Sequence, residues 1–185
     1  MHAREEIAIS VIFTSTATRL IGTHVGGLYC DIVNDEPLSM GFDGPTGLRN
    51  WISGPGYKKQ CEQAKVKILE HIRNGKKVKL NCFGYSRGGV AATYLVKMLG
   101  GYNKDILETN LALLDPVPGN TFIAQILDFF HLTWARQVMD LSDCHNLQAV
   151  HAIYSGKKLH PFINPFFAPV LPKYPSKNTR QRGNC

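Results

Sequence analysis

Short apolar runs alternate along this chain with amphipathic and glycine-rich segments, a pattern that predicts strands alternating with helices. The runs 7–13 and 78–83 are rich in apolar and β-branched residues and are typical of buried strands. Between them, apolar side chains recur every three or four residues over 57–72, with lysine and glutamate on the other side. This spacing predicts an amphipathic helix that ends at Asn74-Gly75.

The same alternation continues through the second half of the sequence. Residues 90–99 and 121–130 predict two further helices, and the apolar runs 111–114 and 147–154 predict two further strands. Strands that alternate with helices imply an α/β fold, in which a mostly parallel sheet carries helices on both faces. In such a sheet, binding and catalytic residues lie at the carboxyl ends of the strands.

Glycine and hydroxyl-bearing residues predict the loops between these elements. Residues 14–18 predict a turn rich in threonine and serine, and 22–29 predict a glycine-rich loop. Residues 41–56 contain five glycines and two prolines and predict a long irregular stretch. Loops of that length in a compact domain are often functional.

The composition is ordinary for a globular domain, with 185 residues, 44% of them hydrophobic and 19% charged. We expect a single domain over 1–185, with a proline-rich, aromatic and basic tail over 161–185 for which an extended conformation is favoured. No apolar run has the length of a membrane span, and acidic residues precede the first run, which argues against a secretory signal. A cytoplasmic enzyme and a leaderless secreted effector both fit.

The distribution of charge bears on which partners the chain could bind. The net charge is +7, from 21 lysines and arginines against 14 acidic residues. A solvated basic tail is the favoured explanation, and contact with an anionic phospholipid surface is the alternative. No basic motif with interleaved aromatics predicts a nucleic-acid partner.

The five cysteines have no metal-ligand spacing and indicate a reducing compartment, and Cys82 is expected to be buried.

The most specific motif is Gly84-Tyr85-Ser86-Arg87-Gly88, the pattern Gly-x-Ser-x-Gly between a predicted strand and a predicted helix. In that context it predicts a nucleophile elbow, a sharp turn that exposes a serine hydroxyl at the end of a sheet. Small residues are needed two before and two after the serine, because strand and helix nearly touch there. The Arg87 amide would then face a developing oxyanion. The alternative is a tight turn with an inert, hydrogen-bonded serine.

A serine becomes a nucleophile when a base takes its proton and an acid orients the base. Asp115 follows the predicted strand 111–114, heads a rigid proline turn and is the candidate acid, although aspartate also simply starts such turns. The candidate bases follow Asp115 in the chain: His131, His145, His151 and His160. We assign His151, with His160 or His145 as alternatives.

The second oxyanion donor in such enzymes comes from a loop after an early strand. Thr14 and Ser15 occupy that place in the sequence. The alternative is a turn in which these hydroxyls bond their own backbone.

Together these motifs resemble an uncharacterised α/β-hydrolase family that includes type VI secretion phospholipase effectors. The family's Gly-Phe-Ser-Arg-Gly elbow corresponds to residues 84–88, its Asp-x-Val turn to 115–117 and its His-Ala strand to 151–152. Its Phe-Asp-Gly-Thr turn corresponds to 13–16, where the sequence departs from the pattern, and its glycine-rich loop to 42–47. The resemblance implies an α/β-hydrolase fold and a lipid or phospholipid acyl ester as substrate.

The family's catalytic histidine lies in a later strand, in a Phe-x-Gly-x-His setting that would begin near Cys185. Three alternatives therefore stay open: a fragment truncated at its C-terminus, an enzyme that uses another histidine, or an inactive relative. We predict a serine esterase of the lipase type, without a metal or organic cofactor. The alternative function is a hydrolase-like binding or regulatory domain that lacks the catalytic histidine. The sequence leaves the oligomeric state open.

Overall fold

The computed structural model describes residues 4–15, 24–44, 55–117, 137–154 and 172–173. Its elements follow the chain in this order: β1 (Glu6–Phe13), α1 (His24–Asp35), β2 (Met40–Phe42), α3 (Pro55–Arg73), β3 (Lys77–Tyr85), α4 (Arg87–Leu99), β4 (Leu107–Leu114) and β5 (Leu147–Ile153). The strands form one five-stranded sheet in the order β2-β1-β3-β4-β5.

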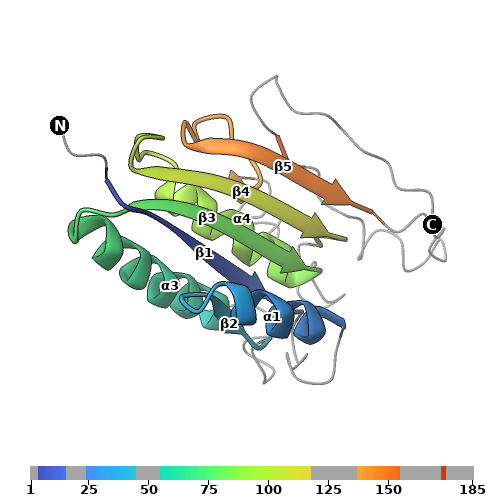
Figure 1. Ribbon diagram of the computed structural model, residues 1–185. Coiled ribbons are helices and arrows are strands. Elements are labelled where there is room, and N and C mark those ends of the chain that lie inside the picture. Colours follow the sequence, from blue (N-terminus) through green and yellow to red (C-terminus); the bar gives the residue numbers. More distant parts are fainter. Residues whose placement is uncertain (1–3, 16–23, 45–54, 118–136, 155–171, 174–185) are drawn as a thin grey trace, which may run out of the picture.

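Every strand pair in this sheet is parallel, so all carboxyl ends meet at one edge (Figure 1). The chain moves from β1 outward to β2 and then returns past β1 to β3, which makes the β1–β3 junction the point where the strand order reverses. Ligand sites in open parallel sheets lie at such a reversal, outside the carboxyl ends of the strands. The predicted α/β class with a mostly parallel sheet is confirmed.

The two faces of the sheet are covered by different helices. One face contributes alternate residues such as Val11, Leu80 and Leu111 to the main core, together with buried residues of α3 and α4. On the other face, Tyr29 and Ile32 of α1 pack against the buried Ile12. Helices therefore lie on both faces, as the alternation of elements predicts.

The predicted helix over 57–72 is confirmed as α3, Pro55–Arg73. Its apolar stripe is buried, with Cys61, Ala64 and Ile68 all at 0% exposure. The helix ends as predicted at Asn74-Gly75. Gly75 has a φ of +79°, its N–H donates to the Ile72 carbonyl oxygen, and the next amide reaches back to His71. This is the hydrogen-bonding pattern of a glycine-terminated helix.

Two loop predictions are wrong. Residues 24–29, predicted as part of a glycine-rich loop, belong to α1, because packing against β1 outweighs the modest cost of glycine in a helix. The irregular stretch predicted over 41–56 begins inside strand β2, which pairs with β1 through Val11↔Met40 and Phe13↔Phe42. At its other end, Gly56 is already part of α3.

The remaining predictions differ in their outcome. The strands predicted over 7–13, 78–83 and 147–154 are confirmed, and β4 begins at Leu107, earlier than predicted. Cys82 is buried as predicted, and burial raises the pKa of its thiol above the usual range. The helix predicted over 121–130 lies outside the described residues, as does the tail over 161–185 apart from Pro172 and Lys173. None of the helices in the described ranges has the length and apolar character needed to cross a membrane.

Candidate active site

Ser86 is the single residue between strand β3 and helix α4. Its backbone has φ 54° and ψ −120°, a combination that residues with a side chain rarely adopt and that costs roughly 1–3 kcal/mol. Such strain persists only where the surrounding structure fixes it, and it is the geometry that a strand–serine–helix elbow requires. The predicted sharp turn at Ser86 is confirmed.

The glycines of the motif are required by close packing. A Cβ atom on Gly84 would lie 2.5 Å from the Cα atom of Gly89, and one on Gly88 would lie 2.6 Å from the carbonyl oxygen of Thr14. Real Cβ atoms essentially never come this close to backbone atoms. The predicted need for small residues on both sides of the serine is therefore confirmed, and the Gly88 contact brings the loop after β1 against the elbow.

Backbone hydrogen bonds hold Ser86 in its strained conformation. Its N–H donates to the Leu114 carbonyl oxygen at 2.8 Å, and its own carbonyl oxygen accepts from Gly89 at 3.0 Å and from Val117 at 3.2 Å. The half-buried side chain caps no helix amide, and its hydroxyl has no hydrogen-bond partner among the described residues. Within the described part of the chain, the serine is thus held by its backbone while its hydroxyl stays available.

Asp115 lies next to Ser86 at the carboxyl edge of the sheet. Tyr85 of β3 is in register with Leu114 of β4, and Ser86 and Asp115 are the residues that follow them. Neighbouring strands are about 4.8 Å apart, so the two backbones are in lateral contact. Asp115 also has a positive φ, 44°, and its N–H donates to the Ile153 carbonyl oxygen at 2.8 Å. The structure therefore brings together the predicted nucleophile and the predicted acid.

The structure does not bring His151 to this pair. His151 lies inside β5, exposed and in register with Ala112, three residues before the level of Asp115. Three residues along a strand and two strands across separate its Cα atom from that of Ser86 by about 14 Å. A catalytic base works within hydrogen-bond reach of the hydroxyl.

The alternative bases lie elsewhere. His145 is exposed and precedes β5, and its N–H donates to the Gly100 carbonyl oxygen, beyond the end of α4. This position is at the amino edge of the sheet, opposite the elbow. His131 and His160 lie outside the described residues, so the third member of the predicted triad stays a prediction.

The predicted oxyanion loop lies beside the elbow, but its first residue, Thr14, already uses its N–H and its hydroxyl in hydrogen bonds. The N–H and the hydroxyl of Thr14 both bond the Phe42 carbonyl oxygen at 3.2 Å, and the Tyr57 hydroxyl donates to the Thr14 carbonyl oxygen at 3.0 Å. Ser15 follows, half-buried, and its amide has no partner within the described ranges. Of the two predicted residues in this loop, Ser15 is the one with a donor to offer.

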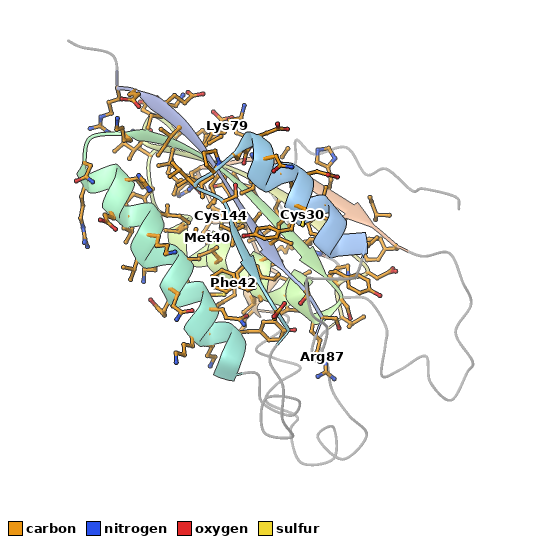
Figure 2. All side chains as sticks on the ribbon, turned by 60° about the horizontal axis from the view of Figure 1, so that its bottom comes forward. Cys30, Met40, Phe42, Lys79, Arg87 and Cys144 are labelled. Atoms are coloured by element: carbon orange, nitrogen blue, oxygen red, sulfur yellow. The ribbon has the colours of Figure 1, made fainter. Side chains whose placement is uncertain are left out.

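Arg87 begins helix α4 directly after the serine. Its amide lies at the helix N-terminus, where backbone N–H groups and the helix dipole favour negative charge. Its side chain is half-buried, and loss of hydration lowers the pKa of the guanidinium. Figure 2 shows this side chain pointing away from the sheet, beyond the ends of the strands.

Sequence reasoning missed two residues that shape the site. Tyr57 was predicted only as part of a buried helix stripe, and Phe42 only through the resemblance, yet both hold the backbone of Thr14. The ring of Phe42 also stacks on Phe13 at a centroid distance of 5.2 Å. No short motif signals these contacts, because they join segments far apart in the chain. In the ranges that the structure describes, no cluster of three His, Cys, Asp or Glu side chains could hold a metal ion.

Comparison with models of known protein families finds no match, and comparison with curated proteins finds none either. Among solved structures, the chain is similar to Est1E from Butyrivibrio proteoclasticus, with 13% sequence identity and a TM-score of 0.48. The similarity covers 97% of this chain and 80% of that chain. A likeness at this level assigns neither a family nor an activity. The name of this neighbour says nothing of type VI effectors, so the resemblance of the sequence to their family stays a prediction.

Proposed function

We propose that this chain is a serine hydrolase that cleaves an ester, with Ser86 as the nucleophile. The observation that carries the proposal is the strained Ser86 backbone, with φ 54° at a one-residue junction of strand and helix. Flanking glycines and three backbone hydrogen bonds maintain this conformation. Strained backbone of this kind clusters at active sites, which supports a chemical role for this serine.

In the proposed reaction, the Ser86 hydroxyl oxygen attacks the carbonyl carbon of the ester while a histidine takes its proton. The tetrahedral intermediate collapses, and the alcohol leaves with the proton that the histidine returns. Water then hydrolyses the acyl-serine by the same two steps. Asp115, beside Ser86 in the sheet, orients the histidine and stabilises its charged form.

We assign the base to His160. His145 precedes β5 at the amino edge of the sheet, and His151 lies in the middle of that strand. His160 follows the carboxyl end of β5 in the chain, and that edge of the sheet holds Ser86 and Asp115. His131, which follows β4, is the second candidate on the same reasoning.

The oxyanion donors in this proposal are the amides of Arg87 and Ser15. The Arg87 amide begins a helix, and the loop of Ser15 abuts Gly88 of the elbow. Two amides directed at one oxygen are worth several kcal/mol of transition-state stabilisation, with about 3 kcal/mol for a single donor. An acyl ester of a lipid or phospholipid is the substrate class that the sequence resemblance suggests.

The experiment is labelling with a fluorophosphonate probe, which reacts only with an activated serine. We expect the wild type to be labelled and Ser86→Ala to be unlabelled, with Ser142→Ala as the control because Ser142 is exposed and remote from the elbow. His160→Ala should remove labelling, whereas His151→Ala and His145→Ala should keep it. Labelling that does not depend on Ser86 would contradict the proposed nucleophile.

The second candidate function is a binding domain that keeps the hydrolase architecture without activity. It is favoured by one observation: neither His145 nor His151, the histidines described after Asp115, lies beside Ser86. In this case the wild type would not react with the probe under any pH at which it stays folded. The labelling experiment therefore separates the two functions.

A further inference from the structure

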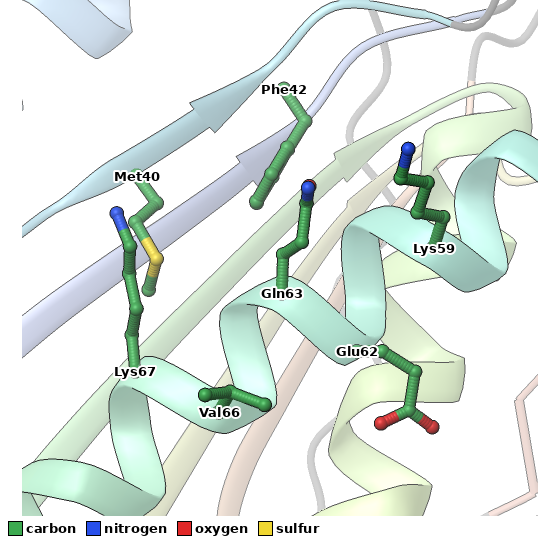
Figure 3. Close-up of a pocket in the computed structure, with 7 residues that line it drawn as sticks. All are labelled: Met40, Phe42, Lys59, Glu62, Gln63, Val66 and Lys67. Carbon is green, nitrogen blue, oxygen red and sulfur yellow. The ribbon is translucent and has the colours of Figure 1, made fainter.

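A groove about 570 Å³ in volume runs between the edge strand β2 and helix α3, on the far side of β1 from the elbow strand. Its apolar floor consists of Met40, Phe42 and Val66, and its rim carries Lys59, Glu62, Gln63 and Lys67 (Figure 3). The volume lies within the range of small-molecule sites, about 300–1,000 Å³. None of these residues belongs to the proposed catalytic group.

The floor leaves apolar surface in contact with water. Val66 is 60% exposed and is an apolar residue on the otherwise polar outer side of α3. Phe42 is half-buried. Covering apolar surface of this kind is favourable in proportion to its area. A ligand with an apolar body therefore gains free energy by lying along the floor.

The rim carries a net positive charge, from Lys59 and Lys67 against the single carboxylate of Glu62. Lys59 and Lys67 lie eight residues apart, about 12 Å along the helix axis, and neither forms an ion pair within the described ranges. In Figure 3 both ammonium groups reach toward β2, whereas the Glu62 side chain, which also lines the groove, points the other way. The Glu62 carboxylate pairs instead with Lys65 at 3.5 Å. The groove thus favours an anion.

The exposed edge of β2 offers little to an added strand. The strand has three residues, and the backbone on both sides of it is already paired: the Ser39 N–H bonds the Glu36 carbonyl oxygen, and the Asp43 carbonyl oxygen accepts from the Gln60 side chain. Strand addition depends on a row of free backbone groups. Recognition here must come from side chains, which favours a small amphiphile over an extended peptide.

We propose that this groove binds a linear fatty carboxylate. Its alkyl chain lies over Met40, Phe42 and Val66, and its carboxylate pairs with Lys59 or Lys67. The site is separate from Ser86 and does not depend on ester hydrolysis.

The test is calorimetric titration of the full chain with sodium laurate below its critical micelle concentration, in the Ser86→Ala background so that no catalytic turnover contributes heat. We expect saturable binding that weakens at high salt. The double variant Lys59→Gln/Lys67→Gln should lose up to about fivefold in affinity, the effect of removing one exposed ion pair. Lys58→Gln, one position away on the same helix and outside the groove, is the matched control. The single variants identify the lysine that holds the carboxylate.

Two further arms separate charge from apolar contact. Val66→Ser should weaken laurate binding, and circular dichroism should show both groove variants folded, since the substituted side chains are exposed. The neutral detergent dodecyl maltoside should bind at least several-fold more weakly than laurate. Absence of laurate binding, or equal binding to the wild-type groove and to the double lysine variant, would overturn the proposal.

Discussion

At the scale of single residues, the elbow glycines carry the heaviest steric constraint. We predict that Gly84→Ala lowers the free energy of unfolding by at least about 2 kcal/mol, because its Cβ would overlap the backbone at the start of α4 and overpacking of this kind costs about 1–3 kcal/mol or more. Urea denaturation measures the change. The control is Gly101→Ala, since a Cβ there meets nothing within 4 Å. Equal stability of Gly84→Ala and the wild type would contradict the packing.

Ser86 itself illustrates a conflict between stability and chemistry. Glycine adopts a positive φ without steric cost, so Ser86→Gly should raise the free energy of unfolding by about 1 kcal/mol while abolishing probe labelling. Ser86→Ala removes the hydroxyl but keeps the strain, and it should not gain this stability. Urea denaturation of the three proteins decides the matter. A Ser86→Gly variant less stable than Ser86→Ala would mean that the backbone is not strained.

At the scale of elements, Asp140 connects three segments near the edge of the sheet. Its carboxylate accepts from the Ser142 amide and side chain and pairs with Lys173 at 3.2 Å, while the Lys97 side chain donates to its backbone oxygen. The hydrogen bonds from Ser142 and then the pairing with Lys173 lower the pKa of this carboxyl to about 2. The segment before β5 is thereby tied to α4 and to the chain near its end.

The lowered pKa of Asp140 predicts that part of the protein's stability is lost in acid. A carboxyl whose folded pKa is below its unfolded value of 3.8 stabilises the protein above that value, and the contribution disappears as the pH falls toward 2. We therefore expect Asp140→Asn to melt at a lower temperature than the wild type at pH 6, and the difference to shrink between pH 4 and pH 2. Thermal melts across this range measure it. A difference that grows at low pH would refute the assignment.

The elements differ in how far their own sequence determines them. Helix α3 could be predicted because its apolar spacing and its glycine stop at Gly75 are both local signals. Helix α1 could not, because its glycines suggest a loop and its stability comes from packing on Ile12, a residue of another element. Strand β2 is three residues long and exists through its pairing with β1. Local patterns identify the long elements, and contacts distant in sequence decide the short ones.

At the scale of the whole molecule, local signals predict one part of the candidate site and contacts distant in sequence decide the rest. The motif predicted the sharp turn at Ser86 because the elbow is a local structure, and the place of Asp115 beside it follows from its position after a strand. The histidine could not be chosen from the sequence, since its position depends on which edge of the sheet it reaches. His151 matches a family pattern by spacing, but the register places it in mid-strand. Strand order and register, rather than spacing, determine which residues meet.

The buried cysteines offer a probe of global unfolding that is independent of the site. Cys61 of α3 and Cys82 of β3 lie in the main core, and burial raises the pKa of the Cys61 thiol to about 12. Thiolates are the reactive form, so both should resist iodoacetamide at pH 8 in the native protein, whereas the exposed Cys30 should react quickly. Peptide mapping by mass spectrometry follows each cysteine separately.

We expect Cys61 and Cys82 to react at one common rate that increases with urea, because both lie in the same packed cluster. Faster labelling of Cys61 than of Cys82 would show that α3 detaches from the sheet before the molecule unfolds.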